Sequence, residues 1–277
     1  MPDSLAFYQL FNLYFLYGSL LLCLLAVCGG ALYHRLRKQA LLPPVPVFPG
    51  SSFPTIWDSL FTFFFLAMIV MITAVDHISQ PPEDDTTRYG LSLTAVVFNL
   101  LIYLPMLIRF GLLPRPATTG HTGVKSIIGL AFITVFGVQI FAIAYELSGV
   151  LDAITSFFQC PKFQAPVMIF LKGDTYSTVM LIIAAVVIAP IGEECCYRGF
   201  LFNCLKKHTH TAVAAVLSSM LFAAVHMSVA QLLPLFLFAI LQCVIYTRSK
   251  SLVAPIVAHA IFNAVSIGLI YLFPPPL

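Results

Sequence analysis

Two adjacent glutamates and an arginine lie together in a long stretch of the chain that is otherwise uncharged. Residues 190–199 read Pro-Ile-Gly-Glu-Glu-Cys-Cys-Tyr-Arg-Gly. Neighbouring residues of an α-helix are about 100° apart, so Glu193 and Glu194 cannot both face one partner, whereas Glu194 and Arg198 are spaced to pair. Glu193 is then left without a counter-ion on its own helix. We therefore expect Glu193 to be the carboxylate that takes up and returns a proton. The alternative is that Glu193, Glu194 and Arg198 form a buried ion network that only holds helices together.

Two more uncharged stretches carry imidazoles. His226 ends the segment Phe222-Ala-Ala-Val-His226, and a single membrane histidine more often joins two helices than performs chemistry. His259 and Asn263 are four residues apart and share one face of a helix. Both side chains can donate hydrogen bonds to a developing negative oxygen, which is what an oxyanion site requires. The alternative for this pair is a polar patch that joins two helices, and Phe222 is expected to be a packing residue.

The composition indicates that these residues belong to a membrane protein. Of 277 residues, 60% are hydrophobic and 9% are charged, against roughly a quarter charged in a soluble domain. The net charge of +3 is small and dispersed, so no nucleic-acid partner is expected. A charged side chain at bilayer depth costs roughly 2.5 to 3.5 kcal/mol. Buried ionisable residues in such a chain are therefore functional candidates by default.

The positions of the charges predict the helices that must hold the candidates. A membrane-spanning helix needs about 20 apolar residues, and the charge-free stretches are residues 4–33, 59–75, 89–108, 126–145, 175–192, 208–247 and 251–277. The 40 residues of 208–247 would span about 60 Å as one helix, so we expect a hairpin that turns near residues 228–234. The fold class predicted is all-α: a polytopic membrane protein of about eight transmembrane helices, with the active site inside the bundle.

The basic residues predict the orientation, because short cytoplasmic loops are enriched in Lys and Arg. With the N-terminus outside, ten of the 14 basic residues fall on the cytoplasmic side. They are Arg35, Arg37, Lys38, Arg109, Arg115, Lys125, Lys206, Lys207, Arg248 and Lys250. Both termini are then expected outside. The first apolar stretch has no basic residue before it and is long, so an uncleaved helix is favoured over a secretory signal.

The loops divide the chain into two parts. A proline-rich link at residues 39–55 and an irregular stretch at 111–123 separate N-terminal helices and linkers, residues 1–125, from a catalytic transmembrane core, residues 126–277. The motifs fall within 175–272. The seven cysteines show no C-x-x-C spacing, which favours neither a disulfide framework nor a zinc knuckle.

Taken together, the three motifs resemble those of a known family. Glu193-Glu194-x-x-x-Arg198, Phe222-x-x-x-His226 and His259-x-x-x-Asn263 look like the signature of the CPBP intramembrane glutamate proteases, which include the CAAX prenyl endopeptidases, Abi proteins and bacteriocin-processing proteins. Any one of these motifs is weak, and all three in order on three predicted helices are strong. The resemblance covers residues 175–272.

The resemblance implies an endopeptidase without a covalent intermediate, a metal or another cofactor. Glu193 and His226 would hold and activate a water, His259 and Asn263 would stabilise the oxyanion, and Glu194, Arg198 and Phe222 would support them. The substrate implied is a peptide or protein, with a prenylated C-terminus as one option, and membrane lipid surrounds the site. The residues around the motifs look more like bacterial members, which favours a prokaryotic plasma membrane.

Several other functions stay open at this point. Glu193, His226 and His259 are acceptable zinc ligands, although the chain has no H-E-x-x-H. A thiol mechanism would use Cys195 or Cys196 with His226. Ser219 lies two helical turns from His226, about 10 Å away, which is too far for a Ser/His pair. A non-catalytic scaffold or a transporter could bury the same polar residues, but we find no repeat or paired broken helices of the kind that transporters show.

Overall fold

The computed structural model of the chain describes residues 4–38, 124–163, 167, 170–171 and 175–274. All regular structure within these residues is helical, which confirms the predicted all-α class. Five helices are long and apolar enough to cross a membrane, at Leu10–Leu32, Lys125–Leu147, Thr178–His208, Leu232–Ser249 and Val253–Leu272. Two of the eight predicted crossings, 59–75 and 89–108, and the link 39–55 lie outside the described residues.

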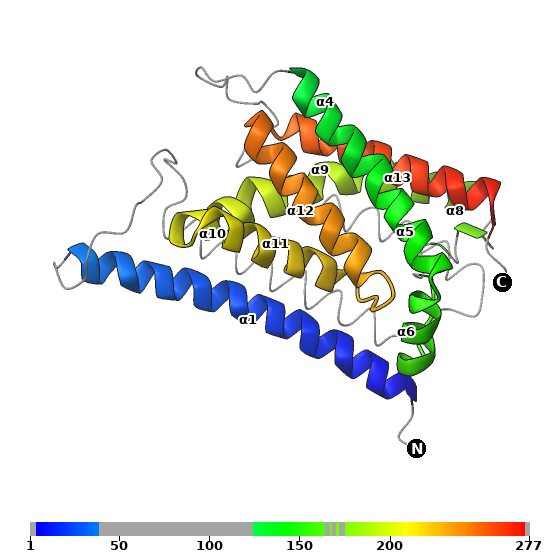
Figure 1. Cartoon of the computed structure of the whole chain (residues 1–277), viewed down its shortest axis with the longest axis horizontal. Coiled ribbons are helices and arrows are strands. Elements are labelled where there is room, and N and C mark those ends of the chain that lie inside the picture. Colours follow the sequence, from blue (N-terminus) through cyan, green and yellow to red (C-terminus); the bar gives the residue numbers. More distant parts are fainter. Residues whose placement is uncertain (1–3, 39–123, 164–166, 168–169, 172–174, 275–277) are drawn as a thin grey trace.

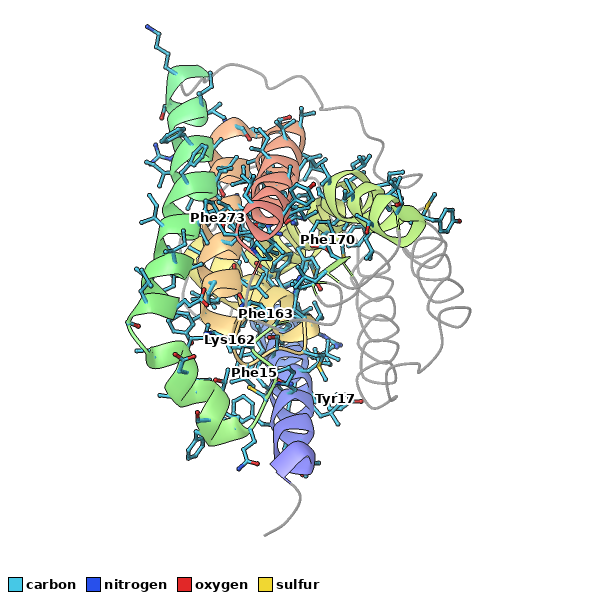
Figure 2. The ribbon with its side chains drawn as sticks, turned by 90° about the vertical axis from the view of Figure 1, so that its right-hand side faces the viewer. Phe15, Tyr17, Lys162, Phe163, Phe170 and Phe273 are labelled. Carbon is cyan, nitrogen blue, oxygen red and sulfur yellow. The ribbon has the colours of Figure 1, made fainter. Side chains whose placement is uncertain are left out.

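The first helix, α1 (Ser4–Lys38), lies along one side of the bundle (Figure 1). Leu16, Cys23 and Val27 are buried in the same core as residues of α10 (Asn203–His208) and α11 (Thr211–Val225). Gly30 is required where α1 reaches α10, because a Cβ there would overlap His208. The opposite side of α1 is apolar and exposed. Figure 2 shows Phe15 and Tyr17 on different sides of this helix.

A second layer lies on the far side of the bundle from α1 (Figure 1). It consists of α4 (Val124–Phe132), a π-helical turn (Ile133–Gly137) and α5 (Val138–Leu147), and it is followed by α6 (Val150–Phe158). Gly149 separates α5 from α6 with a φ of +76°, a conformation that glycine adopts without strain. The chain turns here, so α6 packs on the start of α1 instead of continuing the line of α5 (Figure 1).

The predicted hairpin over residues 208–247 is confirmed. It forms α11 and α12 (Leu232–Ser249), joined by the turn at residues 226–231. At 15 residues, α11 is only about 22 Å long, which is shorter than the roughly 30 Å of a bilayer core. Its C-terminal residue, and therefore His226, can lie inside the bundle. The last helix, α13 (Val253–Leu272), packs against α12.

Figure 1 shows which helix ends lie at each end of the bundle. The end of α1, helix α10, the end of α12 and the start of α4 lie at one end of the bundle. The start of α1, helix α6 and the end of α13 lie at the other. The basic clusters predicted to be cytoplasmic, as far as they are described, are thus grouped at a single end.

Candidate active site

The helix that carries both glutamates is widened on either side of them. The chain runs through α8 (Thr175–Ile183), a π-helical turn (Ala184–Ile188), α9 (Ala189–Glu194), a second π-helical segment (Cys195–Phe202) and α10. Such wide turns inside α-helices are frequent at functional sites. Each leaves backbone carbonyl groups that the helix itself does not pair.

Asn263 fills the first of these gaps. In a π-turn the carbonyl of Ala185 would pair with the N–H of residue 190, but Pro190 has no N–H. The amide Nδ2 of Asn263, on α13, donates to that carbonyl at 2.7 Å. The amide has a second N–H and an oxygen, so this contact uses only part of its hydrogen-bonding capacity.

Asn203 has the same role at the second wide segment. Its Nδ2 lies 3.1 Å from the carbonyl of Arg198 and 3.0 Å from that of Gly199, and 2.7 Å from the hydroxyl of Tyr246 on α12. A side chain that bonds several backbone groups holds an irregular turn in one conformation. The segment that carries Arg198 is fixed from both α10 and α12.

Glu194 is the centre of the buried polar cluster. Its side chain is fully buried, and its Oε1 accepts hydrogen bonds from Arg198 Nη1 at 3.1 Å and from Gln242 Nε2 at 3.2 Å. The Nδ1 of His259 lies 2.9 Å from the same oxygen. The predicted i,i+4 pair of Glu194 and Arg198 is therefore present, and it belongs to a larger network.

Arg198 extends this network to two more helices. Its Nη2 donates to the carbonyl of Ala239 on α12 at 3.0 Å. Its guanidinium lies over the ring of Phe222 on α11, 4.8 Å from the ring centroid, a geometry in which cation and aromatic ring attract each other. A buried charge is tolerated when it is paired and hydrogen-bonded in this way.

Glu193 points to a different part of the cluster. Its Oε2 lies 3.8 Å from Nε2 of His259, and its side chain is 17% exposed, in contrast to the fully buried Glu194. His259 thus lies between two carboxylates, with Nδ1 at Glu194 and Nε2 towards Glu193. The expected difference between the two glutamates is present: one is enclosed by donors and the other is open.

Phe222 connects the motifs. Its ring centroid lies 4.9 Å from that of His226 and 6.1 Å from that of His259, and it also contacts Arg198. Its backbone oxygen accepts a hydrogen bond from Nδ1 of His226 at 2.7 Å. The predicted packing residue therefore orients one histidine and touches the other.

Gln242 was missed by the sequence reasoning. This fully buried residue of α12 donates to Glu194 Oε1 and, at 2.8 Å, to the carbonyl of Pro255 on α13. The only signal available was one amide inside an apolar helix, which is also common where helices simply pack. The residue belongs to no motif.

Two other features bear on the rival mechanisms. Cys195 and Cys196 are buried, at 2% and 0% exposure. Within the described part of the chain, no group of three or more His, Cys, Asp or Glu side chains is arranged to hold a metal ion.

An apolar hollow of about 280 Å³ opens between α1, α11 and the start of α12, lined by Phe15, Met220, Ala223, Leu232, Leu233 and Phe236.

Comparison with known proteins adds two findings. Residues 175–265 match the family model described as type II CAAX prenyl endopeptidase Rce1-like. The chain is 24% identical over 199 residues to the provisionally named membrane peptidase YdiL of Bacillus subtilis (strain 168), covering 72% of this chain and 80% of that protein. No solved structure matches. The resemblance drawn from the three motifs is confirmed for the region that carries them.

Proposed function

We propose that this membrane peptidase hydrolyses peptide bonds with a water activated by Glu193 and His226. The match of residues 175–265 to the Rce1-like CAAX prenyl endopeptidase model supports the proposal. The observation that carries the proposal is the meeting of residues from three motifs on three helices. Arg198, His226 and His259 all contact the ring of Phe222. Ionisable residues inside a membrane are costly and are functional candidates by default.

The tautomer of His226 fits the role of a base. The carbonyl of Phe222 can only accept, so the hydrogen lies on Nδ1 of His226. In the neutral ring Nε2 then has a lone pair, which can take a proton from water. Glu193 is the carboxylate that water can reach, because Glu194 is enclosed. Water attacks the scissile carbonyl carbon, its proton passes to Glu193 or His226, and the leaving amine takes a proton as the C–N bond breaks.

His259 and Asn263 are proposed to stabilise the oxyanion. His259 already uses Nδ1 at Glu194, so it can donate to an oxyanion only through a second hydrogen on Nε2. Asn263 supplies the N–H that the carbonyl of Ala185 does not use.

The proposed substrate is a membrane-associated peptide or protein, cut near a C-terminus that carries a prenyl group. We also propose a prokaryotic plasma membrane, because the residues around the motifs look more like those of bacterial members. Both termini are proposed to lie outside, because the basic helix ends lie at the opposite end of the bundle from the start of α1 and the end of α13 (Figure 1). Cysteine labelling at either terminus in intact cells tests this orientation.

The test is cleavage in proteoliposomes of a quenched fluorescent peptide, with and without a C-terminal farnesylcysteine. We expect Glu193→Gln and His226→Ala each to lower kcat at least about 100-fold without loss of folded protein. The matched control is Glu146→Gln, since Glu146 lies in an exposed ion pair outside the site. Parental cleavage by Glu193→Gln would disprove the mechanism.

The rivals give different results in the same assay. A metal-dependent enzyme loses activity in strong chelator and regains it with Zn²⁺, whereas the proposed mechanism is insensitive to chelation. A thiol mechanism requires the double variant Cys195→Ala/Cys196→Ala to be inactive, and we expect it to cleave. Equal cleavage of the two peptides would show that the enzyme does not require a prenyl group, and the proposed peptidase activity would still stand.

A further inference from the structure

The first helix makes a polar contact beside the proposed base. Asn12 is 3% exposed in a helix made mostly of apolar residues, and its Nδ2 donates to the carbonyl of Met227 at 2.8 Å. These two residues are 215 positions apart in the sequence. A buried amide among apolar side chains is costly without a specific partner, so this contact selects one position of α1 along α11.

The residue that Asn12 holds has an unusual backbone. Helix α11 ends at Val225, His226 is its C-cap, and Met227 follows with a φ of +50°. The position after a helix C-cap is commonly left-handed and is then usually glycine, because a side chain disfavours that conformation. Met227 therefore needs support from its surroundings. The donor from Asn12 fixes its carbonyl, directly after the residue that must aim its imidazole.

We propose that Asn12 is a positioning residue for His226, and that α1 is thereby part of the catalytic unit although it lies outside the residues that match the endopeptidase family. Asn12 holds the turn in its left-handed conformation, and the turn holds the end of α11 where Nδ1 of His226 meets the carbonyl of Phe222. This inference rests on the proposed function of His226 as a base.

Loss of the contact should change the rate and leave binding intact. A shift of the end of α11 misplaces Nε2 of His226 relative to the water, and a misplacement of about 1 Å can lower a rate about 100-fold. Asn12→Leu keeps the size of the side chain and removes the donor. We expect kcat to fall about 10- to 100-fold with KM unchanged within about twofold, the pattern of an interaction used only in the transition state.

Ser19→Ala is the matched control on the same helix. Ser19 is equally buried at 3%, but its hydroxyl donates to the carbonyl of Phe15 within α1. We expect its kcat and KM to stay at parental values. A second comparison uses Met227→Gly, since glycine adopts positive φ without support. In that background Asn12→Leu should lower kcat less than about threefold.

Hydrogen exchange of the peptide spanning residues 222–236 tests the contact without activity. Asn12→Leu should speed exchange of the turn amides about tenfold relative to parent and to Ser19→Ala. If Asn12→Leu lowers the yield of folded protein, Asn12→Ser takes its place, because a serine hydroxyl is too short to reach Met227 and can bond its own helix.

The outcomes separate this inference from the proposed function. An inactive parental protein, or an active His226→Ala, overturns the proposed function and the role of Asn12 with it. An active parent with parental kcat in Asn12→Leu overturns the role of Asn12 alone. Equal losses of kcat in Asn12→Leu and Ser19→Ala, or the same loss with and without Met227→Gly, also overturn it.

Discussion

Two ion clusters at different places in the bundle each pair a basic side chain with carboxylates, in opposite surroundings. At the bundle centre, Arg198 and Glu194 form a pair whose side chains are 1% and 0% exposed. Near the turn between α5 and α6, Lys162 bridges Glu146 at 3.2 Å and Asp152 at 3.0 Å, with 31% to 65% of these side chains exposed. The distances are alike, so distance does not tell what each cluster contributes.

Solvent makes the difference. Exposed pairs gain roughly 0 to 1 kcal/mol because water and salt screen them. Removal of one partner from a buried pair costs about 3 to 5 kcal/mol, because the other charge is left without compensation. The central pair is also connected to Gln242, His259 and Phe222, whereas the outer cluster joins only the end of α5, the start of α6 and the segment after it. We therefore expect the central cluster to couple stability to activity and the outer cluster to affect neither strongly.

The largest effect should follow from Arg198→Met. It leaves Glu194 buried without its charged partner and removes the cation from the ring of Phe222. We expect the free energy of unfolding to fall by about 3 to 5 kcal/mol and peptide cleavage to be lost, as measured by thermal unfolding in detergent and by the proteoliposome assay.

The double variant Glu194→Gln/Arg198→Met is the control for this comparison. Removing both charges together is often nearly neutral for stability, so Tm should recover while cleavage does not. Recovery of cleavage would mean that the central pair is only structural.

A smaller effect is expected from Gln242→Leu. Loss of a hydrogen bond to a charged group costs about 1.5 to 3 kcal/mol, and the carboxylate of Glu194 can then shift relative to His259. We expect Tm to fall and kcat to drop about tenfold.

Gln139→Leu provides the matched variant. Gln139 also joins two helices, by donating to the carbonyl of Phe262 on α13 at 3.3 Å, but it does not contact Glu194 in the described structure. It should lower Tm and leave kcat near the parental value. A similar kcat loss in both variants would show that any link to α13 has the same effect.

Lys162→Met should have a small effect. The free energy of unfolding should fall by less than about 1 kcal/mol, with cleavage at the parental rate. Its Tm difference from the parent should vanish in about 1 M NaCl, because the screening length is then about 3 Å. A loss of more than about 2 kcal/mol would contradict the contrast between the two clusters.

The smallest effect concerns pH. The hydrogen bond to Asp152, aided by Glu146, raises the pKa of Lys162 above its ordinary value of 10.5. A raised pKa in the folded state means that the contribution is fully present below 10.5 and is lost as the pH rises through the folded value. The Tm difference between the parent and Lys162→Met should thus be constant from pH 7 to 10 and shrink above that range. A difference that shrinks between pH 7 and 9 would contradict this assignment.

Much of the fold could be predicted because the bilayer restricts the choices. Apolar length identified the helices that are long enough to cross a membrane, and the 40-residue stretch turns between α11 and α12 as expected. The prediction did not foresee that α11 would be short or that the helix of Glu193 would contain two wide turns. Both depend on which carbonyl groups find partners on other helices, such as Asn263 for Ala185, and spacing within one helix does not contain that information.

Only the part of the site that depends on spacing within one helix could be predicted. The pairing of Glu194 with Arg198 follows from i,i+4 spacing. The three motifs also named Arg198, His226 and His259, which lie around Phe222. The partners of His259 did not follow, because Glu194 and Glu193 approach it from another helix. Gln242 and Asn12 carry no motif, and each is significant only through what it touches 48 and 215 residues away.

The sequence by itself determined that this is a helical membrane protein, which stretches are apolar enough to be candidates for crossing the bilayer, and which few polar residues are costly there. Periodicity and transfer energies act along one helix, so these conclusions needed no tertiary contact. Only the tertiary structure decided that His259 lies between Glu194 and Glu193, that the ring of Phe222 lies beside Arg198 and His259, and that Asn12 of α1 bonds the turn after α11. These are relations between helices, and they arise because a buried donor or acceptor is stabilised by a partner on another helix where water is absent.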